Sequence, residues 1–170
     1  MTRSVLVLGV AHELQGSKFQ GYVDDPSHGL LLKISMHGVD FVFEEASGLG
    51  PSKAEDLAIS ILGAGQYVDI DPSLSERSSY GIPEVTAEGH AVAPMHSTES
   101  YCSLLMEAQR IREEVWIQRI KRQTFKKALA IVGIGHSLSI AFRLESAGFV
   151  IAEIRAYTPY GVLCRRAHSA

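Results

Sequence analysis

The stretch Ala128–Ile140, which reads ALAIVGIGHSLSI, decides the fold. Its first half is a continuous apolar run, and Gly-Ile-Gly-His then leads into residues that begin a helix. The stretch Ser4–Leu14, SVLVLGVAHEL, repeats the pattern near the other end of the chain, with His12 three residues after Gly9. Short apolar runs of this kind are typical of strands covered on both faces in a parallel sheet. Each stretch therefore predicts a buried strand that places a histidine just beyond its C-terminal end.

The composition limits the class of protein and its partners. The chain has 170 residues, of which 46% are hydrophobic and 21% charged, and this suits one domain with an ordinary core. Its formal net charge of −3 gives no electrostatic reason to expect nucleic acid or a membrane surface as a partner. Cys102 and Cys164 form no C-x-x-C site and fit a reducing compartment. With the N-terminal apolar run interpreted as a strand rather than a signal peptide, we expect a soluble, cytoplasmic protein.

Alternating strand and helix patterns predict a single layered α/β domain over residues 1–170, in which helices flank a largely parallel β-sheet. The predicted strands are 4–10, 39–45, 66–70, 128–134 and 149–157. The last strand alternates apolar and polar residues, which is typical of an edge strand. The predicted helices are 52–65, 98–127 and 136–147, with Ser52 as the N-cap of the first and Gly148 after the last.

The segment 72–97 breaks this alternation. It is rich in serine, proline and glycine, and it is too long for a plain connection between neighbouring elements. Long segments of this kind are usually functional lids or mobile insertions. We therefore predict a loop or lid excursion at 72–97, with an insertion of no function as the alternative.

The two G-x-x-H motifs predict one shared site. Ligands of open α/β sheets lie beyond the carboxyl ends of the strands, where both His12 and His136 would stand. Gly9 and Gly133 let the backbone turn sharply or approach another segment closely. A neutral imidazole there serves as a metal ligand or a general base. Two alternatives stay open: one histidine caps a helix while the other packs in the core, or the turn with Gly133 and Gly135 binds an anion.

Acidic side chains stand at the end of another predicted strand. The strand 39–45 ends in Glu44 and Glu45, and adjacent residues on a strand point to opposite faces, so we expect one of them to face the site. Burying two acids after an apolar run costs free energy unless the protein needs charge at that place. The alternative is that the strand end is exposed to solvent. Asp71 and Arg77, at the start of the excursion, are secondary candidates for substrate binding, or else ordinary turn residues.

The helix predicted at 98–127 turns two arginines toward its apolar face. At about 100° per residue, Arg112 and Arg119 fall within the arc of apolar residues. Glu113 and Glu114 fall outside that arc. An inward guanidinium requires a carboxylate or another acceptor. We therefore expect Arg112 to pair with an acid of the site, with extension along the edge of the arc as the alternative for both arginines.

The order of these motifs resembles the TraB/Tiki superfamily, which includes ChaN-like and erythromycin-esterase-like proteins. The similarity covers about Val5 to Ala147 and is carried by LGVAH, FVFEE, IREEVW and VGIGH. Activities in that superfamily differ: Tiki proteins act as metal-dependent peptidases, erythromycin esterases hydrolyse a lactone, and ChaN-like proteins bind haem. The chain departs from the pattern in being short and in doubling the glutamate. The resemblance implies an α/β fold whose cleft is lined by His12, Glu45 (or Glu44), Arg112 and His136.

These patterns together predict a hydrolase that acts on an acyl bond, peptide or ester, of a small molecule or peptide. In one version the two histidines and Glu44 or Glu45 hold a divalent metal (Mn, Co, Zn or Fe), which lowers the pKa of a bound water toward roughly 7. In the other, His12 is the general base for water, held by Glu45. In both, Arg112 stabilises the developing oxyanion or orients a carboxylate of the substrate. The alternative is a non-catalytic protein that binds haem, a metal or an anion. The sequence leaves open whether the chain forms a homo-oligomer.

Overall fold

A computed structural model describes residues 2–15, 25–46, 52–83, 98–158 and 161–165. They form a layered α/β fold around a six-stranded sheet with strand order β3-β2-β4-β1-β5-β6. The first five strands are parallel, and β6 pairs antiparallel with β5. The strands are β1 (Ser4–Val10), β2 (Phe41–Glu44), β3 (Tyr67–Asp69), β4 (Lys127–Gly133), β5 (Val150–Thr158) and β6 (Gly161–Arg165). The predicted fold class is confirmed.

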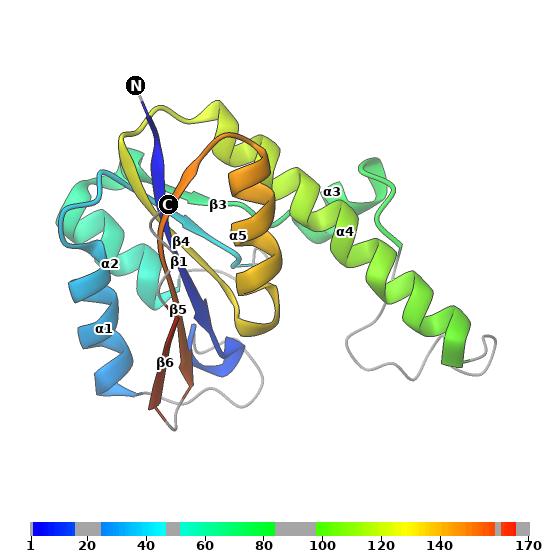
Figure 1. Ribbon diagram of the computed structural model, residues 1–170, viewed down its shortest axis with the longest axis horizontal. Helices are drawn as coiled ribbons and strands as arrows, with labels where there is room; N and C mark the ends of the chain where they lie inside the picture. The colour runs from blue at the N-terminus through cyan, green and yellow to red at the C-terminus, as the bar shows by residue number, and fades with distance from the viewer. Residues whose placement is uncertain (1, 16–24, 47–51, 84–97, 159–160, 166–170) are drawn as a thin grey trace.

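Helices cover both faces of the sheet. Helices α1 (Pro26–Met36) and α2 (Lys53–Leu62) pack on one face, and α4 (Thr98–Arg122) and α5 (Ser137–Ser146) pack on the other (Figure 1). The first half of α4 extends beyond the sheet, as Figure 1 shows. Within the described ranges, none of the helices has both the length and the apolar character needed to cross a membrane.

The continuous apolar runs follow from this two-sided burial. Along β1, Val5 and Val7 belong to the core beneath α4 and α5, whereas Leu6 and Leu8 belong to the core beneath α1 and α2. All four side chains are buried. Because successive side chains of a strand point to opposite faces, a strand covered on both sides needs apolar residues at every position.

The predicted helix ends are largely confirmed. Ser52 is the N-cap of α2, and its hydroxyl accepts a hydrogen bond from the backbone N–H of Glu55 at 2.9 Å. After α5 the chain passes through Gly148, whose φ of 90° is the left-handed conformation that glycine adopts at low cost. The long helix ends at Arg122, earlier than predicted, because Lys127 already belongs to β4.

Three features of the fold differ from the sequence-based expectation. The strand predicted at 149–157 is not an edge, because β6 pairs with it on its outer side. Helix α1 was not among the predicted helices. The predicted excursion 72–97 contains a short helix, α3 (Leu74–Ser79), which begins with a capping box between Ser73 and Glu76. Residues 84–97 of that excursion lie outside the described residues.

Candidate active site

Three neighbouring strands end at one place. In the order β2-β4-β1, Glu45 follows β2, His136 follows β4 in the turn η3 (Ile134–His136), and His12 follows β1 in the turn η1 (His12–Leu14). The Nε2 atom of His12 lies 4.0 Å from Glu45 Oε1, and the Nε2 atom of His136 lies 3.9 Å from the same oxygen. The two histidines and one glutamate therefore meet, as the motifs predicted.

Close backbone approach explains two of the predicted glycines. A Cβ atom on Gly133 would lie 2.5 Å from His12 Nε2, so the imidazole packs directly on this residue. A Cβ atom on Gly9 would lie 2.8 Å from the Cβ atom of Ser137, at the start of α5. Gly135, by contrast, has open space around the same position. The first glycine of each motif thus lets the two strand ends pack together.

Glu45 is the acid at the centre of the site, and both of its oxygens accept hydrogen bonds. Oε2 accepts from the backbone N–H of Gly133 at 2.7 Å, and Oε1 accepts from Arg112 Nη2 at 2.7 Å. The guanidinium also donates through Nε to Asp71 Oδ1 at 2.9 Å. Burial by itself would lower the pKa of Arg112, but Asp71 and Glu45 raise it above its ordinary value. A charged arginine therefore holds the buried Glu45.

Asp71 and Arg77 stand behind Arg112 rather than beside the histidines. Asp71 is 2% exposed; its Oδ1 atom also accepts from the indole N–H of Trp116 at 3.0 Å, and its Oδ2 atom accepts from Arg77 at 3.0 Å. Arg119 points inward as predicted and donates to the backbone carbonyl of Asp71. These contacts form a network around Asp71 that fixes Arg112, and the substrate contacts predicted for Asp71 and Arg77 stay a prediction.

Glu44 turns to the opposite side of β2 from Glu45. It is fully buried, and its carboxylate accepts hydrogen bonds from Ser52 Oγ, from Tyr67 Oη at 2.9 Å and from Gln15 Nε2 at 3.2 Å. Burial raises the pKa of Glu44 to about 7, although these three hydrogen bonds act in the opposite direction. Of the two glutamates, Glu45 therefore lies beside the Nε2 atoms of the histidines, and Glu44 lies in a buried network on the other side of β2.

The Nδ1 atom of His136 contacts a carboxylate that sequence reasoning had placed outside the apolar arc. Glu113 is 4% exposed, and its Oε1 atom lies 2.9 Å from His136 Nδ1. Its Oε2 atom accepts from Ser139 Oγ at 2.6 Å and from Arg143 Nε at 2.8 Å. Burial alone would raise the pKa of Glu113, but the hydrogen bonds from these partners lower it. Helical periodicity placed Glu113 outside the arc that packs on the sheet, and it could not show that α5 packs beside α4 and covers that side of the helix.

The Nδ1 atom of His12 contacts an amide that sequence reasoning missed. Gln15 Oε1 lies 2.6 Å from His12 Nδ1, and the residue is 1% exposed. The two residues are three apart in the turn after β1, a separation that brings side chains of a helical turn together. That spacing is the signal in the sequence that could have identified Gln15.

The predicted divalent metal would need Glu45 as a ligand. A cation bonded to Oε1, at about 2.0–2.2 Å, would share this oxygen with the guanidinium of Arg112, which donates to it at 2.7 Å. The other oxygen is held by the N–H of Gly133. No cluster of three or more His, Cys, Asp or Glu side chains in the described part of the chain is arranged to hold a metal ion. In this arrangement Glu45 is already paired with Arg112 and with the N–H of Gly133, and the divalent metal stays a prediction.

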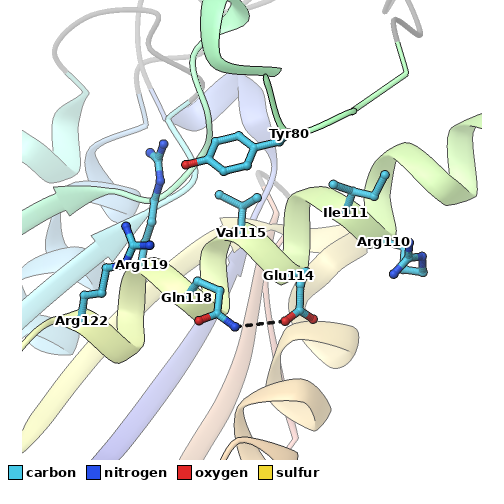
Figure 2. Close-up of a pocket in the computed structure, with 8 residues that line it drawn as sticks. All are labelled: Tyr80, Arg110, Ile111, Glu114, Val115, Gln118, Arg119 and Arg122. Carbon is cyan, nitrogen blue, oxygen red and sulfur yellow. Dashed lines mark hydrogen bonds between the residues drawn. The ribbon is translucent and has the colours of Figure 1, made fainter. Parts of the chain in front are cut away.

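A separate pocket lies on another side of α4. Its volume is about 320 Å³, and Tyr80 faces Val115 across it, with Arg119 at one end (Figure 2). Neither histidine of the candidate site lines it. The pocket and the histidine cluster are therefore distinct features.

Comparisons with known proteins do not assign the chain to a family. No protein-family model matches it, and searches of curated proteins and of solved structures gave no match. The interpretation of the site therefore depends on its own geometry.

Proposed function

We propose that the chain is a hydrolase that cleaves an ester or peptide bond with water as the nucleophile. The observation that supports this most directly is the convergence of His12 Nε2 and His136 Nε2 on one oxygen of a buried, arginine-held glutamate. Two imidazoles with separate anchors provide a proton acceptor and a proton donor at one place. The order and placement of the motifs also support the proposal that the chain is a compact member of the TraB/Tiki superfamily.

His12 is the proposed general base. Its side chain is 45% exposed, so water and substrate can reach the ring, whereas the side chain of His136 is 11% exposed. The Nε2 atom takes a proton from water as the water oxygen attacks the carbonyl carbon. The negative charge of Glu45 stabilises the imidazolium that forms on His12.

His136 is the proposed general acid, and Arg112 the proposed oxyanion donor. The Glu113 carboxylate at Nδ1 stabilises a positive charge on the His136 ring, which suits a ring that delivers its proton to the leaving oxygen or nitrogen as the acyl bond breaks. The Nη1 atom of Arg112 makes no hydrogen bond to a residue that the structure describes, and the side chain is 17% exposed. It is therefore available to donate to the carbonyl oxygen as charge develops there.

The test is hydrolysis of a panel of p-nitrophenyl esters and peptide p-nitroanilides. We expect His12→Gln to lower kcat/KM by roughly 10²–10⁴-fold, the usual contribution of a positioned general base. The matched control is His37→Gln, since His37 is an exposed histidine at the end of α1. Equal turnover by the wild type and His12→Gln, or no turnover of any substrate in the panel, would contradict the proposal.

The same assay separates the two predicted versions of the chemistry. Activity that survives prolonged treatment with EDTA supports water activation by His12 alone. Activity that is lost with EDTA and restored by one divalent ion supports the metal version, and it would mean that Arg112 moves away from Glu45 when the ion binds.

A further inference from the structure

A buried glutamine connects His12 to the end of β2. Gln15 Nε2 donates to Glu44 Oε1 at 3.2 Å and to the backbone carbonyl of Glu45 at 2.9 Å. Its Oε1 atom lies 2.6 Å from His12 Nδ1. The side chain is 1% exposed, so no bulk water competes for these contacts. One amide thus contacts the candidate base on one side and two acceptors on the other.

These acceptors determine which way the amide points. The carbonyl of Glu45 can only accept a hydrogen bond, and it does so whatever the protonation state of the Glu44 carboxyl. Rotating the amide by 180° would place Gln15 Oε1 against both of those oxygens and leave buried acceptors unpaired, at a cost of about 1–3 kcal/mol for each group. The nitrogen therefore faces Glu44 and Glu45, and the oxygen faces His12.

The orientation of the amide in turn determines the tautomer of His12. An amide oxygen can only accept, so Nδ1 of His12 must carry the hydrogen of this contact. In the neutral ring the lone pair is then on Nε2, the atom that lies 4.0 Å from Glu45 Oε1. An imidazole in water prefers the opposite tautomer, with its hydrogen on Nε2. The folded chain thus selects the less common form.

The surroundings of Gln15 hold it in place. Its backbone N–H donates to the carbonyl of His12 at 3.0 Å, and its carbonyl accepts from the N–H of Lys53 at 2.9 Å. The Glu44 carboxylate is itself held by Ser52 and Tyr67. Because each contact of the amide is anchored by other elements, its orientation is a property of the fold.

We propose that Gln15 is a positioning residue that holds His12 in the Nδ1–H tautomer and so makes Nε2 the proton-accepting atom. The catalytic consequence rests on the proposed hydrolase function, whereas the tautomer itself can be measured without any activity. Gln15 acts through His12 and does not contact the reacting atoms.

The direct test is two-bond ¹H–¹⁵N correlation NMR of the histidine rings in the full-length, ¹⁵N-labelled protein, at a pH where His12 is neutral. This experiment distinguishes the ring nitrogen that carries hydrogen from the one that does not. We expect the wild-type His12 ring to be predominantly Nδ1–H, because the hydrogen bond to Gln15 outweighs the preference of a free imidazole for the other tautomer. A predominantly Nε2–H ring in the wild type would overturn the proposal without any variant.

Gln15→Met tests the cause, because it keeps the length of the side chain and removes the amide. We expect the tautomer ratio of His12 to fall by about tenfold toward the Nε2–H form. The matched control is Gln118→Met, at an exposed glutamine of α4 that contacts Glu114 instead, and it should leave the His12 signals unchanged. An unchanged tautomer in Gln15→Met would also overturn the proposal.

Kinetics separates this inference from the proposed function. Since Gln15 does not touch substrate, Gln15→Met should lower kcat by about tenfold and leave KM unchanged. A protein that hydrolyses no acyl substrate but shows the Nδ1–H tautomer, lost in Gln15→Met, would retain the positioning role and lose the hydrolase. A hydrolase whose His12 is Nε2–H would lose only the positioning role.

Discussion

The two histidines of the candidate site end neighbouring parallel strands, yet the fold surrounds them differently. His12 is 45% exposed and contacts the neutral amide of Gln15 through Nδ1. His136 is 11% exposed, packs edge-on against Trp116 and contacts the Glu113 carboxylate through Nδ1. Of these two Nδ1 partners, only Glu113 carries a negative charge. The same residue type at equivalent positions is thereby prepared for two roles, a proton acceptor on the β1 side and a proton donor on the β4 side.

The largest effect should come from removing the charge that distinguishes the two rings. Glu113→Gln keeps the shape of the side chain but takes away the negative charge beside His136 Nδ1. By analogy with other carboxylates behind a catalytic histidine, we expect kcat/KM to fall by about a thousandfold. Steady-state kinetics on the best ester of the panel checks this. A loss smaller than about tenfold would mean that the two histidines do not differ in the way proposed.

The next effect concerns stability on the β1 side, where Glu44 anchors Gln15. The unfolded chain loses the Glu44 proton near its ordinary pKa of 4.5, whereas the folded chain keeps it up to about 7. The folded state therefore binds more protons between these values, so the free energy of unfolding should fall as pH rises through this window. The fall is on the order of 3 kcal/mol. Urea unfolding at a series of pH values checks it.

Glu44→Gln is the matching variant, because it removes the titration and keeps the size of the side chain. Its free energy of unfolding should lack this decline, while other groups continue to contribute equally to both proteins. If wild type and Glu44→Gln give parallel curves between pH 4.5 and 7, the buried carboxyl does not titrate in that range.

A smaller loss should follow from crowding the place where the two strand ends meet. Gly133→Ala puts a Cβ atom 2.5 Å from His12 Nε2, so the ring must move. We expect about a hundredfold loss of kcat/KM from this displacement and roughly 1–3 kcal/mol of destabilisation. Gly135→Ala, two residues on in open space, is the control and should keep activity within a few-fold. Similar behaviour of the two variants would contradict the close packing of His12 on β4.

The smallest effect should come from the outer end of the His136 network. Arg143 donates to Glu113 at 2.8 Å, but its side chain is 30% exposed and solvent screens the pair. Arg143→Gln should therefore cost no more than about 1 kcal/mol of stability. Arg110→Gln, which breaks the exposed pair with Glu107, should cost less still. Thermal unfolding of both variants at low and high salt gives the comparison. A destabilisation above about 2 kcal/mol for Arg143→Gln would mean that the Arg143 charge is less solvated than its exposed fraction indicates.

The strands and the inward direction of Arg112 could be predicted because each depends on local pattern. The apolar runs predicted the bounds of β1 correctly and those of β4 to within one residue, because burial on both faces demands apolar residues at every position. Strands β1, β2 and β4 proved to be neighbours, and this brought His12, Glu45 and His136 together. The inward direction of Arg112 followed from helical periodicity alone.

The failures arose where a second element changes the surroundings of a residue. Glu113 lies outside the arc that packs on the sheet, but α5 covers it and provides Arg143 and Ser139. The strand at 150–158 alternates in the manner of an edge strand, yet β6 continues the sheet beyond it. A helical projection or an alternation pattern describes one element at a time, and neither reports what packs against it.

The sequence by itself determined which strands are buried, that a histidine follows two of them and that an acid follows a third, because period and composition act over a few residues. Only the tertiary structure decided that Glu45 rather than Glu44 meets the histidines, and that Glu113 contacts Nδ1 of His136. These outcomes depend on strand order and on helix packing between residues as far apart as 88 positions in the chain. Hydrogen-bond partners at such separations are set by the fold as a whole, since no local pattern encodes them.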